Sequence, residues 1–455
     1  GASLAGTQGF VKSGSGTLHL GGTSNYSGTT TANLGTLELT TPNSFGASGV
    51  GNETVVNGNA PARVRIGGAT STAESFIISG TGASNVGAIN FGSSQIGVNT
   101  TGTITGQITL SADAQIGAAN GSSGVLDRSG AGDAIETNGF RVSFTGGGTL
   151  RVNSAIAGTG GALAHGGSGV VTLTAANTYT GTTAITGNGS LRLGAGGTDG
   201  SLSISSAISM AAAQSTFVVD QSDTVTQGVD FSGAAITASV GGPGIGNFIQ
   251  AGSGTTILNA ANSYRGATNV NAGTLLINGD QSAADGAVTV ASGATLGGSG
   301  TTGGAVSILG GAIVAPGSGV GTLTVSNAFT LADSSILNFQ LDPANNAVGG
   351  GINDLITGVS NLTLDGVLNV SSAGGWTSVA DFTTWRLFNY SGTLTNNLLA
   401  LGTMPTLGSG QSFQIDTSTS GQVNLIVVPE PSTLVLLSGL VVVGFFARRQ
   451  RGGRG

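Results

Sequence analysis

The stretch GTLHLGGTSNYSG (residues 16–28) decides the fold, because it recurs twice further along the chain. The second copy is GVVTLTAANTYTG (169–181), and the third is GTTILNAANSYRG (254–266). In each copy a tyrosine lies ten residues after the first glycine, and a second apolar stretch follows, such as GTLEL (35–39) after the first copy. A unit repeated in this way predicts an array of stacked units rather than one globular core.

The repeats are predicted to be β-strands, because apolar and polar residues alternate within them. In GTLEL, Leu37 and Leu39 flank Glu38, and in GSLRL (189–193) two leucines flank Arg192. Successive side chains of a strand point to opposite faces, so we expect Glu38 and Arg192 to be exposed. The residues that we expect to be buried are Leu18, Leu20, Leu37, Leu39, Leu191, Leu193, Leu275 and Ile277. The same alternation continues in Val288/Val290, Val306/Ile308, Leu323/Val325 and Leu337/Phe339/Leu341.

Glycine-bearing turns separate these strands, and no stretch between them has the pattern of a crossover helix. Two all-β architectures then remain: an antiparallel sandwich, or a solenoid whose parallel strands stack rung on rung. The solenoid fits better, because a repeat that cannot bury its apolar face alone can bury it against its neighbours. The apolar residues are mostly small or branched, which suits a narrow core.

The composition excludes several classes of protein. Only 7% of the residues are charged, 84 of 455 are glycine, and cysteine is absent, which excludes a disulfide scaffold. The net charge of −7 argues against a nucleic-acid partner, which would need a basic surface. The hydrophobic share of 38% argues against disorder, since disordered chains combine low hydrophobicity with high net charge.

The repeat resembles the autotransporter-associated β-strand repeat, whose consensus reads SGTLTLSGxNTYTGxTxxxxGTLxL. The stretch from Gly286 to Val325 resembles the late part of passenger domains that carry such repeats. This resemblance implies a right-handed parallel β-helix (β-solenoid) over residues 1–341. Autotransporters continue into a translocator domain, and we see no such block after these repeats. We therefore expect another export route, or a separately encoded translocator.

Residues 342–428 differ from the repeats. Asp342 and Pro343 interrupt the strand pattern, and both tryptophans, Trp376 and Trp385, follow. Their larger side-chain volume could close the end of a rod. We expect a C-terminal β cap here.

The tail carries the most specific motif in the chain. Pro429, Glu430 and Pro431 precede an apolar segment (432–447), which ends at Arg448, Arg449 and Arg451. As a helix the segment would span about 24 Å, slightly short of a bilayer core. Arginines resist crossing the membrane and stay cytoplasmic. Two interpretations fit: a plain transmembrane anchor, or a processed sorting signal.

The tail closely resembles the PEP-CTERM signal of Gram-negative bacteria, which is the substrate of exosortase. The resemblance covers residues 429–455. It implies export, transient anchoring in the inner membrane, cleavage near Pro429–Pro431, and delivery to the envelope or the exopolysaccharide matrix. Export also needs an N-terminal signal, and the chain starts at Gly1 without one. We therefore expect that such a signal precedes residue 1 in the full protein.

An enzyme is the alternative, because parallel β-helices include polysaccharide lyases and hydrolases. Those sites need converging carboxylates, and acids here are sparse. The candidates are Asp127 with Arg128, Asp133 and Glu136 nearby, and the pair Asp220 and Asp223. Strand alternation would place Asp220 and Asp223 on opposite faces, so we predict no catalytic residues.

We also predict no metal and no cofactor site. Gly196 and Gly351 each begin one isolated copy of a calcium-repeat-like turn, and a true site stacks several. His19 and His165 are too far apart in sequence to suggest a ligand pair. Arg63 and Arg65 are expected to lie on a solvated strand face rather than to form an anion site.

The sequence thus predicts an exported, non-enzymatic surface or matrix structural protein, and adhesion is the role that we consider for it. The implied partners are an exosortase-type enzyme, the inner membrane before processing, and exopolysaccharide as a candidate ligand.

Overall fold

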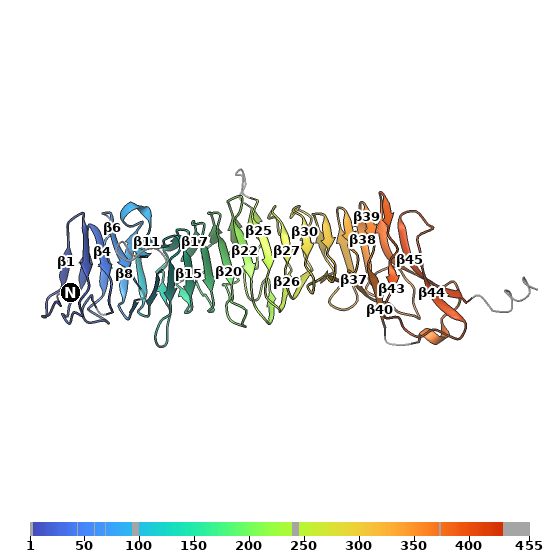
Figure 1. Ribbon diagram of the computed structural model, residues 1–455, viewed down its shortest axis with the longest axis horizontal. Coiled ribbons are helices and arrows are strands. Elements are labelled where there is room, and N and C mark those ends of the chain that lie inside the picture. The colour runs from blue at the N-terminus through green and yellow to red at the C-terminus, as the bar shows by residue number, and fades with distance from the viewer. Residues whose placement is uncertain are drawn as a thin grey trace, which may run out of the picture.

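The computed structural model describes residues 3–42, 44–58, 60–68, 70–92, 100–238, 245–372 and 375–430. In Figure 1 these residues form an elongated rod of short strands that stack side by side along its axis. The strands of neighbouring rungs are parallel, as in a β-solenoid; for example, Val170–Leu173 pairs in register with Ser190–Leu193. The all-β prediction is confirmed, and the antiparallel sandwich is excluded for the rod.

Four sheets run along the rod in the described part of the chain. The first sheet contains β1 (Phe10–Lys12), β2 (Thr17–Leu20), β3 (Thr30–Ala32), β4 (Gly35–Leu39), β5 (Thr54–Val56), β6 (Ala62–Ile66), β8 (Phe76–Gly80), β9 (Ile89–Phe91), β11 (Ile108–Ala118), β13 (Ile135–Glu136), β14 (Arg141–Thr145), β16 (Ile156–Ala157), β17 (Ala162–His165), β19 (Thr183–Ile185), β21 (Ile208–Met210) and β24 (Thr237–Ala238). The second contains β7 (Ser71–Thr72), β10 (Thr101–Ile104), β12 (Ser123–Leu126), β15 (Thr149–Val152), β18 (Val170–Leu173), β20 (Ser190–Leu193), β22 (Thr216–Val219), β25 (Asn247–Gln250), β27 (Thr268–Val270), β30 (Val288–Val290), β33 (Val306–Ile308), β36 (Phe329–Leu331), β39 (Leu362–Leu364) and β42 (Leu394–Asn396).

The third and fourth sheets belong to the C-terminal half. The third contains β23 (Thr224–Thr226), β26 (Thr255–Leu258), β28 (Thr274–Ile277), β31 (Thr295–Gly298), β34 (Ile313–Pro316), β37 (Ile336–Gln340), β40 (Val367–Ser371) and β43 (Ala400–Leu401). The fourth contains β29 (Asp280–Gln281), β32 (Thr301–Thr302), β35 (Thr322–Val325), β38 (Leu355–Val359), β41 (Thr384–Tyr390), β44 (Gln411–Asp416) and β45 (Gln422–Pro429). Helical structure in the described residues is limited to two short 3-10 turns, η1 (Ala83–Asn85) and η2 (Trp376–Ser378).

The repeated glycines are explained by the distance between rungs. In the first repeat Gly35 stacks on Gly16, and a Cβ on Gly35 would lie 2.5 Å from the Gly16 carbonyl oxygen. Gly273 stacks on Gly254 in the same way, at 2.2 Å. Both Gly35 and Gly273 also have a positive φ, 76° and 61°, which disfavours other residues. The glycine that opens each GTLxL strand is therefore required by the approach of the preceding rung.

The apolar side chains of the repeats fill the interior, as expected. Seven of the eight residues that we expected to be buried are at most 9% exposed: Leu20, Leu37, Leu39, Leu191, Leu193, Leu275 and Ile277. The residues of the later alternating pairs, from Val288 to Leu341, are also buried. Leu18 is only half-buried; it lies on β2, which among the described strands pairs with β4 alone.

The parallel ladders continue past residue 341. In this region β40 pairs with β37, and β43 pairs with β40. Antiparallel pairing begins where β45 joins β41 and β44. Trp376 packs here on Trp385, with ring centroids 4.7 Å apart, and on Phe413 at 5.3 Å. The division into 1–341 and 342–428 stays a prediction, and the ladders cross that boundary.

Candidate functional site

The sorting motif begins at the exposed end of the last strand. Pro429 closes β45 and pairs with Gln411, and the Glu430 backbone N–H donates to the Gly410 carbonyl at 2.8 Å. Both Pro429 and Glu430 are exposed, so the first two motif positions are accessible to another protein. Figure 1 shows β44 and β45 at the end of the rod opposite the N-terminus.

The other predicted motif residues, Pro431, Arg448, Arg449 and Arg451, lie outside the described residues, as does the predicted transmembrane segment 432–447. Within the part of the chain that the structure does describe, no helix has both the length and the apolar character needed to cross a membrane.

An ionic row lies on the outward face of the first sheet. Glu38 on β4 is paired in register with His19 on β2 and with Arg65 on β6. One Glu38 carboxylate oxygen lies 3.2 Å from His19 Nδ1 and 3.4 Å from Arg65 Nη1. The prediction that Glu38 is exposed is wrong: it is fully buried, because its neighbours on the adjacent rungs cover it.

The second expected exposed residue, Arg192, is half-exposed. Its Nη1 lies 2.7 Å from the Asp220 carboxylate on the next rung. The prediction that Arg63 and Arg65 form a solvated face is also wrong. Arg63 is 9% exposed, and the Arg65 side chain is 17% exposed. In each case residues of the adjacent rungs bury part of the side chain. The alternation of residues along one strand cannot predict that burial.

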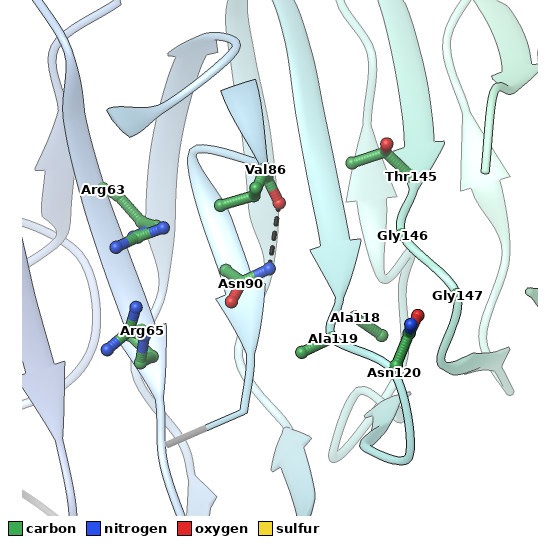
Figure 2. Close-up of a pocket in the computed structure, with 10 residues that line it drawn as sticks. All are labelled: Arg63, Arg65, Val86, Asn90, Ala118, Ala119, Asn120, Thr145, Gly146 and Gly147. Atoms are coloured by element: carbon green, nitrogen blue, oxygen red, sulfur yellow. Dashed lines mark hydrogen bonds between the residues drawn. The ribbon is translucent and has the colours of Figure 1, made fainter. Parts of the chain in front are cut away.

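Arg63 and Arg65 line a pocket of about 350 Å³ (Figure 2). The pocket crosses from β6 over β9 to the ends of β11 and β14 and the residues that follow them. Its lining consists of Arg63, Arg65, Val86, Asn90, Ala118, Ala119, Asn120, Thr145, Gly146 and Gly147. From the sequence, an anion site at these two arginines was the interpretation that we set aside in favour of a solvated face. The available indication was the ARVRI strand (62–66), where two of the chain's 13 basic residues share one face.

The acids considered for catalysis have different surroundings. Asp220 pairs with Arg192, and Arg128 Nη1 donates to the Asp133 backbone carbonyl at 3.1 Å. Asp127 and Asp223 are exposed. Among the residues that the structure places, no group of three or more His, Asp or Glu side chains could hold a metal ion.

Two buried carboxyls were not singled out by the sequence. Glu74 accepts a hydrogen bond from Thr54 Oγ1 at 2.6 Å, and burial raises its pKa to about 8. Asp354, in the second calcium-repeat-like turn, accepts from the backbone N–H groups of Gly321 and Gln340, both at 2.7 Å. Burial raises the pKa of Asp354 to about 7. Asp354 therefore braces neighbouring strands through backbone hydrogen bonds.

The two histidines lie in different surroundings. His165 is 1% exposed, its Nε2 lies 3.0 Å from the Gly169 carbonyl oxygen, and burial lowers its pKa. His19 contacts Glu38 on the outward face.

Two family models match parts of the chain. The passenger-associated-transport-repeat matches residues 10–39, 166–193 and 248–277, which contain the three repeats described above. The PEP-CTERM protein-sorting motif matches residues 427–451. Both predicted resemblances are confirmed.

A curated relative is the adhesin BmaC autotransporter of Brucella suis biovar 1 (strain 1330). It is 46% identical over 114 residues, which cover 25% of this chain and 3% of the adhesin. The chain thus matches only a small part of that relative. Together, the repeats and the sorting motif indicate an exported surface protein of a Gram-negative bacterium.

Proposed function

We propose that this protein is a non-enzymatic structural rod that is exported, processed by an exosortase-type enzyme, and displayed on the cell surface or in the extracellular matrix. The observation that carries the proposal is the position of the sorting motif: it starts at exposed residues where the last strand of the rod ends. A protease that reads Pro429, Glu430 and Pro431 would release the whole rod and remove only the tail.

The finer features of the proposal follow the family resemblances and the composition of the C-terminal segments. The solenoid winds to the right, residues 342–428 cap it, and residues 432–447 form a transient helix in the inner membrane. A helix is required there because a lone strand would leave its backbone amides unpaired in lipid. The residues that stay on the cytoplasmic side of the membrane and set the orientation of the helix are Arg448, Arg449 and Arg451.

Adhesion is the role that we assign to the displayed rod. The relative of which this chain covers a short part is called an adhesin. The rod is long, its strand faces are rich in Ser, Thr and Asn, and few of its residues are charged. Such a surface can offer hydrogen bonds to exopolysaccharide over many rungs.

Intact-mass analysis of the protein from its native host tests the processing step. We expect a mature chain that ends near Pro429–Pro431 in cells with a working exosortase, and a chain with its tail where that enzyme is deleted. Glu430→Ala should block processing. Asp333 is an exposed acid between β36 and β37, and the control variant Asp333→Ala should be processed normally. If the chain recovered from exosortase-positive cells still ends in RRQRGGRG, the tail is not processed. The transmembrane-anchor interpretation of the tail would then remain.

The alternative function, a polysaccharide lyase or hydrolase, has its own test. We expect no depolymerisation of the host exopolysaccharide, pectins or glucans by the purified protein. Turnover that disappears in Asp220→Asn or Asp127→Asn would overturn the structural role in favour of an enzyme.

A further inference from the structure

The pocket lined by Arg63 and Arg65 has the charge of an anion site. The whole chain has a net charge of −7. Among the described residues that line the pocket, two are arginines and none is acidic. The rest of the lining consists of the polar residues Asn90, Asn120 and Thr145, the apolar residues Val86, Ala118 and Ala119, and Gly146 and Gly147, as Figure 2 shows.

Arg63 has hydrogen-bonding capacity that the protein leaves unused. Its Nη2 donates to Thr36 Oγ1 at 3.0 Å, and its Nη1 donates to the Ala83 carbonyl at 3.3 Å. Its Nε is buried and has no hydrogen-bond partner within the described residues. No salt bridge joins Arg63 to a carboxylate in that part of the chain. Beyond these bonds, Nη1 and Nη2 each carry a second N–H, which can donate to an oxyanion in the pocket.

Arg65 adds a second charge, two residues along the same strand. It keeps its contact with Glu38 at 3.4 Å, and its side chain remains 17% exposed. Arg63 and Arg65 lie side by side on the outward face, and their mutual repulsion, after burial, helps to lower the pKa of Arg63 to about 10. A bound anion would relieve that repulsion.

The turn that precedes the lining residue Val86 has an unusual conformation. Ser84 and Asn85 in η1 have φ values of 62° and 55°, in the left-handed region that non-glycine residues rarely adopt. The neighbouring Ala83 carbonyl receives the Arg63 hydrogen bond, and Asn90 Nδ2 donates to the Val86 carbonyl at 2.9 Å. These two contacts fix the turn against the pocket, so its shape exists before a ligand arrives.

We propose that this pocket binds the carboxylate of an acidic saccharide, such as a uronate unit of a polysaccharide. The planar guanidinium fork matches a carboxylate. The amide groups of Asn90 and Asn120 and the Thr145 hydroxyl suit sugar hydroxyls, and the lining has no aromatic or large apolar anchor of the kind that holds a peptide. The volume of about 350 Å³ is at the lower end for small-ligand pockets. The choice of a polysaccharide rests on the proposed surface role; the anion site does not.

Calorimetric titration of the purified full chain tests the inference with three probes. The first is a galacturonate tetrasaccharide, the second is its neutral methyl ester, and the third is a tetraglutamate peptide of matched charge. We expect the free acid to bind and the ester and the peptide to bind at least tenfold more weakly. Equal binding of the ester would overturn the role of the carboxylate, and equal or tighter binding of the peptide would overturn the saccharide.

Arg63→Gln and Arg65→Gln should each weaken binding of the free acid by about tenfold or more, because each removes a charge-assisted hydrogen bond. Arg151→Gln is the matched control, since Arg151 is exposed on β15 and makes the same charge change outside the pocket; it should leave the affinity unchanged. Thermal melting checks folding. If Arg63→Gln does not fold, Arg65→Gln and the ester comparison still decide. Wild-type affinity in both pocket variants would overturn the site.

Recovery of the processed chain from the cell surface separates this inference from the proposed function. A displayed and processed rod that does not bind the galacturonate probe would contradict the proposed binding site but not the surface role. A chain that binds the probe but is never displayed would contradict the surface role but not the binding site.

Discussion

Tyr179 and Thr183 share a hydrogen bond inside the rod: the Tyr179 hydroxyl lies 2.7 Å from Thr183 Oγ1, and both residues are fully buried. The third repeat has the same pair, Tyr264 and Thr268, at 2.8 Å. Tyr26 and Thr30 are bonded in the first repeat as well. The tyrosine of each repeat therefore combines a large apolar ring with a satisfied hydroxyl, which a buried tyrosine needs.

Removing the tyrosine hydroxyl should cost different amounts in two repeats. Thr183 also lies 2.6 Å from the Ser206 hydroxyl, so Tyr179→Phe leaves it a partner. Thr268 has no second hydroxyl partner among the described residues. We expect Tyr264→Phe to lower the free energy of unfolding by about 1–3 kcal/mol and Tyr179→Phe by about 1 kcal/mol. Chemical denaturation measures both, and equal losses would contradict the role of Ser206.

Replacing Glu38 by Ala should destabilise the N-terminal rungs by about 3 kcal/mol, because it leaves Arg65 half-buried without its carboxylate partner. Asp223→Ala removes the same charge from an exposed position and should change the stability by less than about 0.5 kcal/mol. Thermal melting of the two variants gives the comparison. Similar melting temperatures would mean that the row of His19, Glu38 and Arg65 contributes nothing to stability.

The direction in which a side chain points should decide the effect of a new charge. Leu193 is 1% exposed, so Leu193→Asp would place a carboxylate in an apolar interior and should prevent folding of the surrounding rungs. Val170, on the neighbouring strand β18, is 37% exposed, and Val170→Asp should be tolerated. Circular dichroism and limited proteolysis distinguish these outcomes. A folded Leu193→Asp variant would show that the strand register is wrong.

Stability should fall with rising pH because of Glu74. Its pKa is raised from 4.5 to about 8 in the folded protein. Between these values the unfolded chain has lost the proton and the folded chain still holds it. The free energy of unfolding therefore decreases as pH rises through this window, by at most about 1.4 kcal/mol per pH unit. Below pH 4.5 and above pH 8 the contribution is flat.

Glu74→Gln should remove this pH dependence of stability. The side-chain oxygen of the new glutamine can still accept the hydrogen bond that the Thr54 hydroxyl donates. Melting temperatures of the wild type and of this variant, measured from pH 4 to pH 9, provide the test. We expect the difference to favour the variant increasingly as pH rises. Parallel curves would show that Glu74 ionises at its ordinary pKa in the folded protein.

Local pattern was sufficient to predict the strands and the identity of most core residues. Leu191 and Leu193 point inward because a strand alternates its faces, and this is a property of the residues themselves. The sorting motif was also visible locally, since Pro429, Glu430 and Pro431 are consecutive. Tyr179 and Tyr264 revealed the repeat, although their hydrogen bonds to threonine were not foreseen.

The sites missed from the sequence depend on contacts between rungs. Glu38 was expected in solvent, yet His19 and Arg65 cover it from both neighbouring strands. The pocket is lined by Arg63 together with Asn120 and Thr145, which lie on later rungs of the rod. Neither arrangement follows from alternation along one strand, because rung length varies: Val288 pairs with Val306, whereas Phe329 pairs with the more distant Leu362.

The sequence by itself determined a repeated, parallel β architecture and a C-terminal sorting motif, because both are written in short-range order: alternation within a strand, glycines at fixed positions, and consecutive motif residues. Only the tertiary structure decided which charges are buried and where the arginine pocket lies. The physical reason is that burial on the outer face depends on register between rungs. Turns of unequal length set that register, and side chains on adjacent rungs then cover or expose one another.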